Sequence, residues 1–189
     1  MNVKALLTNR FAALSAMAAG ALWIASGAMQ LTKRDDIVGE AVDTLAAHVL
    51  LGLLAGALVL TVPAVLTLGR HARGRGPRFS YAASAGMLTV AVAATTANIV
   101  GEDPLFFLVA APLGNLFWLV GTIGLAVALH RAGVVPRSVA IALPSMQVFA
   151  LPLSFIGGPI VTGAFWIAIG YLLEAGALPA RRSSVAAAS

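Results

Sequence analysis

The sequence predicts an all-α integral membrane protein, a single bundle of six transmembrane helices with both termini in the cytoplasm. Three observations lead to this prediction. The chain is 60% hydrophobic and 10% charged, with a mean hydropathy of +0.94, which is too apolar for a soluble globular domain. Its charged residues collect in short segments between long uncharged runs, and crossing a bilayer takes about 20 apolar residues. Basic and acidic segments alternate along the chain, as successive loops on opposite sides of a membrane do.

The uncharged runs place the helices in one domain over residues 1–180, followed by a cytoplasmic tail over 181–189. The last run, 138–173, has 36 uncharged residues, too long for one crossing at about 1.5 Å per residue. We expect Gly157-Gly158-Pro159 to break it. The expected helices cover about 11–31, 45–69, 79–101, 104–129, 138–156 and 160–178.

The orientation follows from the loop charges. The loop over 70–78 carries four arginines between two uncharged runs, and so basic a short loop stays in the cytoplasm. With this loop inside, the predicted inner side holds ten of the twelve lysines and arginines. The predicted outer side holds six of the seven aspartates and glutamates. The sequence therefore predicts a multi-pass protein of a bacterial cytoplasmic (inner) membrane.

Composition excludes several classes of chemistry. The chain has no cysteine, hence no disulfide, no thiolate metal site and no cysteine nucleophile. The net charge of +5 comes from loops, so the positive-inside rule explains it without a nucleic-acid partner. Asp36, Glu40 and Asp43 share one helical face that suits a hard cation, yet we expect them to be solvated. No two histidines fall at mid-membrane to ligate a haem, and we expect neither cofactor nor metal.

Polar residues within apolar runs are the candidate binding residues, because each needs a partner or water inside a membrane. Asn115 and Gln147 fall near mid-membrane by helical rise. The alternative is that these two amides bond to each other, or to carbonyls freed by Pro112 and Pro144. The full candidate set for a pocket open to the outer side is Asp43, His48, Asn98, Glu102, Asn115 and Gln147.

Glu174 is the one carboxylate expected within a helix of the membrane domain. It is a candidate proton carrier, because burial raises the pKa of a carboxyl group. The competing interpretation is an ion pair with Arg131 or Arg137, or a side chain that reaches toward the inner surface, and we favour this structural role.

Two patterns concern packing. Ala12, Ala16 and Gly20 form a stripe of small residues that allows a neighbouring backbone to approach closely. Such a stripe serves packing within the chain, or contact with a second copy or a partner membrane subunit. The segment His71-x-x-Gly74-x-x-Pro77-Arg78 recurs 59 residues later from His130 to Arg137. This echo indicates either repeated hairpins or only the residues that membrane turns commonly use.

The run Leu129-His130-Arg131-Ala132-Gly133-Val134-Val135-Pro136-Arg137 and the proline-broken helix after it resemble the C-terminal half of uncharacterised multi-pass membrane proteins of high-GC bacteria. This resemblance covers about a third of the chain and implies no chemistry. By size and helix count, the chain is also similar to the substrate-binding subunits of energy-coupling-factor vitamin transporters. Those are six-helix proteins with an AxxxA stripe in the first helix, which Ala12 and Ala16 match.

Three function classes follow from these features. The preferred one is binding or transport of a small solute, mostly apolar or cationic, that enters from the acidic outer side. The second is an integral-membrane enzyme acting on a lipid or isoprenoid, with Glu174 or an outer carboxylate as the acid. The third is a structural or accessory membrane subunit. The expected partners are the lipid bilayer and a small-molecule ligand.

Overall fold

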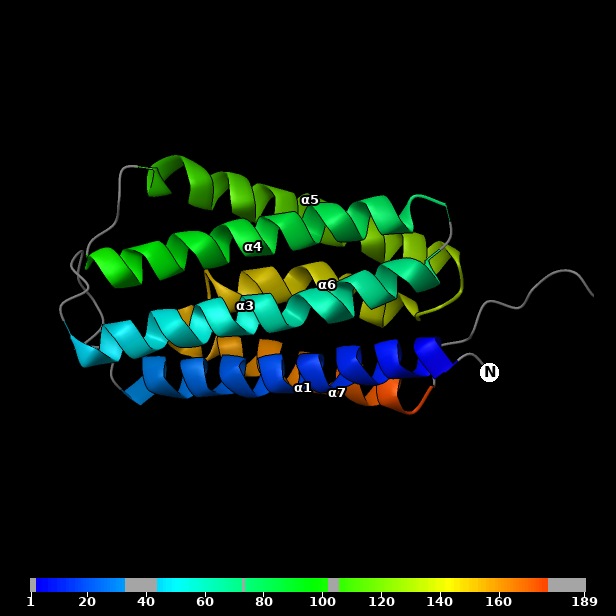
Figure 1. Cartoon of the computed structure of the whole chain (residues 1–189), viewed down its shortest axis with the longest axis horizontal. Coiled ribbons are helices and arrows are strands. Elements are labelled where there is room, and N and C mark those ends of the chain that lie inside the picture. The colour runs from blue at the N-terminus through cyan, green and yellow to red at the C-terminus, as the bar shows by residue number, and fades with distance from the viewer. Residues whose placement is uncertain (1–2, 33–43, 73, 102–105, 177–189) are drawn as a thin grey trace, which may run out of the picture.

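The computed structural model describes residues 3–32, 44–72, 74–101 and 106–176 and contains only helices in these ranges. Asp43 and Glu102, two of the candidate binding residues, lie outside them. Figure 1 shows the elements side by side along the long axis of the molecule. They are α1 (Val3–Thr32), α3 (Leu45–His71), α4 (Gly76–Val100), α5 (Phe107–Arg131), α6 (Arg137–Ala150), the 3-10 helix η1 (Ser154–Ile156) and α7 (Gly158–Glu174).

The helix ends follow local sequence signals. The Thr44 hydroxyl caps α3 by accepting a hydrogen bond of 3.1 Å from the Ala47 amide. Pro77 and Pro159 stand in the first turns of α4 and α7, where a helix needs no amide donor. Gly157 precedes α7 with a φ of 88°, a conformation that favours glycine. The break expected at Gly157-Gly158-Pro159 is therefore present.

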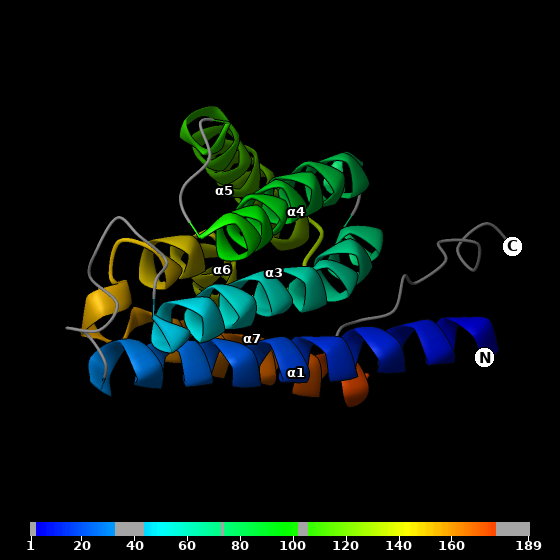
Figure 2. The ribbon, with the colours of Figure 1, turned by 60° about the vertical axis from the view of Figure 1, so that its left-hand side comes forward.

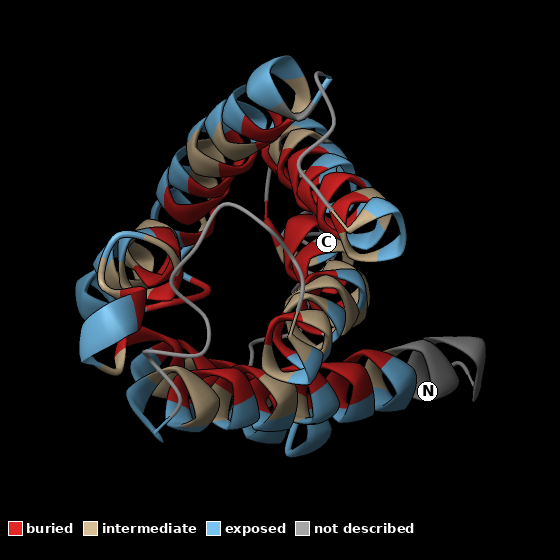
Figure 3. Ribbon diagram, turned by 90° about the vertical axis from the view of Figure 1, so that its left-hand side faces the viewer, coloured by how far each residue is buried: buried red, intermediate tan, exposed pale blue. Residues whose placement is uncertain are grey.

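The helices pack in chain order around a ring. α3 packs between α1 and α4, α5 packs on α4, and α6 joins α5 to α7. α7 returns to pack against α1, so the last helix closes the ring on the first. Figure 2 shows α1, α3 and α7 on one side and α4 and α5 on the other. Figure 3, a view along the bundle, shows buried residues on the faces that the helices turn toward one another.

The two closest helix pairs, α1 with α7 and α4 with α5, depend on glycine. A Cβ atom at Gly20 would lie 2.5 Å from the carbonyl oxygen of Gly163, and one at Gly163 would collide with the carbonyl oxygen of Gly20. Gly86 and Gly114 oppose each other in the same way between α4 and α5. Small residues permit this approach, and in lipid the resulting van der Waals contact is a main source of helix association.

The small-residue stripe of α1 is used inside the chain. Ala12 and Ala16 are buried, and Gly20 faces the backbone of α7. Of the two interpretations of this stripe, packing within the chain is the one present in the structure.

The helix expected over 138–156 is shorter than predicted. α6 ends at Ala150, and η1 follows after a turn. The physical reason is Pro152, which has no amide hydrogen and cannot continue the helical hydrogen bonds. At about 1.5 Å per residue, the 14 residues of α6 and the 17 of α7 are shorter than a hydrocarbon core of about 30 Å. α1, α3, α4 and α5 are long and apolar enough to cross a membrane, whereas a count of six crossings stays a prediction.

The outer surface of the bundle is apolar. Large side chains on α4 and α5, including Ile99, Leu108 and Leu116, are exposed. A soluble monomer rarely exposes apolar area on this scale, while a bilayer provides a matching environment. The structure is thus compatible with a multi-pass membrane protein.

The glycine contact between α1 and α7 provides a first test. We expect Gly20→Ala to lower the free energy of unfolding by about 1–3 kcal/mol, because the added methyl group meets the α7 backbone. Gly52→Ala is the matched control, since the nearest atom to its added Cβ is Asn98 Nδ2 at 3.9 Å. Reversible unfolding in detergent measures both. A Gly20 variant as stable as the Gly52 variant would contradict this account of the packing.

The predicted orientation is testable on α3, because the chain has no natural cysteine. Leu45 and Arg70 are exposed residues near opposite ends of this helix. We expect a membrane-impermeant thiol reagent to label Leu45→Cys from outside the cell and Arg70→Cys only from the cytoplasmic side. Labelling of both from one side would refute the topology.

Candidate functional site

Two of the candidate residues, His48 and Asn98, are brought together. They lie near the first turn of α3 and the last turn of α4, and His48 Nδ1 is 2.6 Å from Asn98 Oδ1. With the Asn98 amide oxygen as acceptor, His48 Nδ1 is the donor in this contact. Both side chains are half-buried. The pair therefore links α3 to α4.

Asn115 and Gln147 also meet, across α5 and α6. Gln147 Nε2 donates to the backbone oxygen of Asn115 at 2.9 Å and lies 3.1 Å from its Oδ1. Asn115 Nδ2 donates to the carbonyl of Ala111 at 2.9 Å. Gln147 is 7% exposed, and its Oε1 is buried without a hydrogen-bond partner. Mutual bonding, one of the two alternatives for these amides, is the arrangement present.

Glu174 forms an ion pair, but with neither of the expected arginines. Its Oε1 lies 3.5 Å from Nε of Arg10 on α1, and the two side chains are 39% and 70% exposed respectively. The expectation of Arg131 or Arg137 was wrong because α7 packs antiparallel to α1, which brings its last residue to the first turns of α1. Glu174 is the final residue of α7 and is exposed.

A small cavity lies between α1, α3 and the end of α6, at the end of the bundle where α1 stops and α3 begins. It has a volume of about 140 Å³. Leucines from α3 form much of its wall. The lining residues are Trp23, Ser26, Gln30, Leu50, Leu51, Leu54, Ala150, Leu151 and Ser154.

Two polar atoms of the lining residues lack partners. Trp23 is 1% exposed, and its Nε1 has no hydrogen-bond acceptor. The Oε1 of Gln30 is buried and accepts no hydrogen bond. Leaving a buried donor or acceptor unpaired costs about 1–3 kcal/mol. Both atoms belong to side chains that line the cavity, and a guest bonded to them would recover this energy.

The sequence alone does not single out this cavity. A tryptophan inside a helical run, such as Trp23, suits packing or a pocket wall better than an interfacial belt, and its position does not decide between the two. Ser26 and Gln30 were not singled out, although residues 23, 26 and 30 fall on one helical face by their spacing. Their contacts on α3 and α6 depend on tertiary packing, which no local pattern in the sequence reports.

Within the described ranges, no group of three or more histidine, aspartate or glutamate side chains is placed to hold a metal ion. The acidic face over Asp36, Glu40 and Asp43 lies outside those ranges.

The structure has four long apolar helices, close packing at small residues and an apolar exterior. These features are compatible with a multi-pass membrane protein. No family model, curated protein or solved structure matches the chain. The resemblance to multi-pass membrane proteins of high-GC bacteria, and the likeness in size to vitamin-transporter subunits, therefore stay predictions.

The ion pair of Arg10 and Glu174 provides the third test. Because both groups are exposed, we expect Glu174→Gln to cost less than about 1 kcal/mol of unfolding free energy. Arg10→Gln added to that variant should cost almost nothing more, since the pair is already broken. Arg131→Gln is the control and should be additive with Glu174→Gln. If the effect of Glu174→Gln were non-additive with Arg131→Gln and additive with Arg10→Gln, Glu174 would pair with Arg131 instead.

Proposed function

We propose that this protein binds a small, neutral, mostly apolar solute inside the membrane. The observation that carries the proposal is the 140 Å³ cavity, with its leucine walls and with Trp23 Nε1 and Gln30 Oε1 unpartnered. Apolar walls with a few oriented polar groups are the usual composition of a small-molecule site.

The volume of the cavity limits the size of the solute. An apolar cavity of about 150 Å³ accommodates a molecule such as benzene. A guest of that size with one hydroxyl group would accept a hydrogen bond from Trp23 and donate one to Gln30. The lining also limits the charge of the solute, because the lining residues include no carboxylate and no basic side chain. This favours a neutral guest over the cationic one that the acidic outer loops suggested.

The place of the cavity supports entry from the outer side. Gln30 is two residues from the end of α1, and Leu50 lies in the second turn of α3. By the charge rule, this end of the bundle faces away from the cytoplasm. Transport of the solute across a bacterial cytoplasmic membrane is a second step of the proposal and requires a path past α6, where Gln147 holds Asn115.

The two competing functions have less support. A lipid-modifying enzyme needs an acid beside its substrate; Glu174 is engaged with Arg10, and the outer carboxylates considered for this role lie outside the described residues. An accessory subunit gives no role to unpartnered polar atoms beside a cavity, since these lower its stability.

Phenol and benzene test the proposal. We expect phenol to raise the melting temperature of the purified protein, and benzene to do so less strongly because it makes no hydrogen bond. Gln30→Leu should weaken phenol binding about fivefold, the worth of roughly one hydrogen bond, and leave benzene binding intact. The same variant should be more stable than the natural chain without solute, because it removes a buried unpaired acceptor.

Filling the cavity supplies the control. Ala150→Leu places extra methyl groups in the cavity and should abolish the shift with both solutes. Ala164→Leu adds the same groups to the exposed face of α7 and should leave both shifts unchanged. Phenol binding that survives in the Ala150 variant would overturn the assignment of the cavity.

A further inference from the structure

A groove separate from the proposed solute cavity runs between α5 and α6 at the opposite, basic end of the bundle. Its volume is about 380 Å³. Most of its wall is apolar, and its end at the turn between the two helices carries His130, Arg131 and Arg137. The apolar part of the lining comprises Ile123, Ala126, Val127, Ala140, Ile141 and Pro144.

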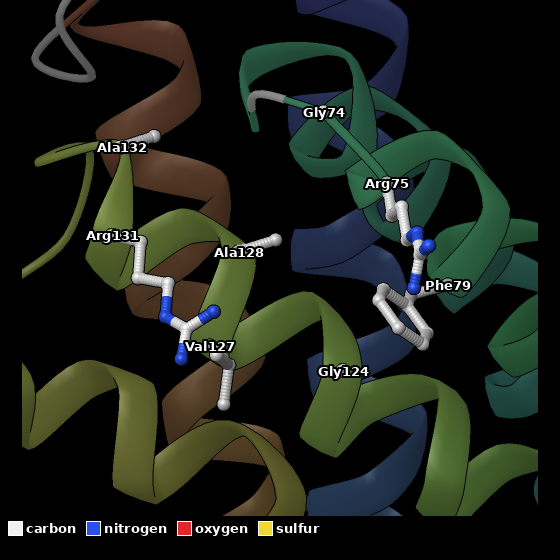
Figure 4. Close-up of a pocket in the computed structure, with 8 residues that line it drawn as sticks. All are labelled: Gly74, Arg75, Phe79, Gly124, Val127, Ala128, Arg131 and Ala132. Atoms are coloured by element: carbon white, nitrogen blue, oxygen red, sulfur yellow. The ribbon is translucent and has the colours of Figure 1, made fainter.

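A second groove lies on the other face of α5, toward the start of α4. Its volume is about 520 Å³, and Phe79, Gly124 and Val127 contribute to its wall. Figure 4 shows Arg75 above the ring of Phe79 on one side and Arg131 on the other. Arg131 and Val127 line both grooves, so the last turns of α5 form a ridge between them.

These arginines have no acidic partner among the described residues. The ion pair found there joins Arg10 to Glu174, and no carboxylate contributes to either groove. Arg75, Arg131 and Arg137 are exposed at the mouths of apolar grooves. Exposed guanidinium groups in this setting are free to bind a phosphate group, for which they form well-matched paired hydrogen bonds.

We propose that the two grooves bind an anionic phospholipid, independently of the solute cavity. The phosphate lies at Arg131, supported by Arg137 or Arg75, and the acyl chains follow the grooves on either side of α5. Length agrees with this assignment. Ile123 lies eight residues before Arg131, a rise of about 12 Å, close to half of a hydrocarbon core of about 30 Å.

The groove walls favour a lipid over a free anion. Ile141 is 58% exposed, and Ile123 and Val127 are also exposed, so the grooves are open along their length to whatever surrounds the bundle. In a bilayer the grooves would face the acyl chains of the lipids. A phosphate ion alone would leave these walls without a role.

Lipid binding measured by native mass spectrometry from an uncharged detergent tests the inference. The probes are dioleoyl phosphatidylglycerol and dioleoyl phosphatidylcholine, which have the same chains and differ in net charge. We expect the phosphatidylglycerol to bind about tenfold more tightly to the natural chain, since each nearby arginine contributes to attraction of an anionic lipid. The double variant Arg131→Gln/Arg137→Gln should lose this preference.

Two further variants distinguish lipid binding in these grooves from general attraction to a basic surface. Arg70→Gln/Arg78→Gln removes two exposed arginines at the same end that do not line either groove, and should keep the tenfold preference. Ala140→Trp fills the α5–α6 groove without changing charge and should weaken the phosphatidylglycerol. Equal loss in both arginine variants, undiminished binding in the Ala140 variant, or displacement of the lipid by inorganic phosphate alone would each overturn the inference.

Discussion

The backbone contact of α1 with α7 at Gly20 and Gly163 is the constraint on which the rest of the bundle depends. It joins the first helix to the last, and so closes a ring that would otherwise be an open row of helices. Because lipid offers no hydrophobic drive for association, this closure rests on close van der Waals contact, which a larger side chain at Gly20 or Gly163 would weaken. The proposed solute cavity is bounded by α1, α3 and the end of α6, so it exists only while the ring is closed.

Much of the fold could be predicted from the sequence because the governing forces act locally. A long uncharged run must be helical in a membrane, since every amide needs a partner within the segment. Glycine, proline and arginine then mark the turns, as at Gly157. The end of α6 at Ala150 differs from the expected end at residue 156 because Pro152 lacks the amide hydrogen that would continue the helix.

The sequence predicted which residues were candidates for the site, but not which of them contact one another. The rarity of amides in apolar runs singles out Asn115 and Gln147 correctly as a pair that needs partners. Which groups meet is decided by helix order and direction. Glu174 lies beside Arg10 because α7 is antiparallel to α1. No local pattern in the sequence indicates that the two residues are neighbours. The cavity at Trp23 lies where α1, α3 and the end of α6 meet, and the grooves beside α5 lie between helix pairs, so all three depend on helix packing.

The short helices α6 and α7 have a consequence for the surrounding bilayer. α6 and α7 offer about 21 and 25 Å of helix, against about 38 Å for the 25 residues of α4 or α5. Such a bundle is asymmetric in hydrophobic thickness. Lipids beside the short pair must compress, while the long helices tilt or extend beyond the core, at a cost of a fraction of a kcal/mol per Å of mismatch. In a bilayer, a thinner membrane would therefore match the α6 and α7 face more closely than a thicker one.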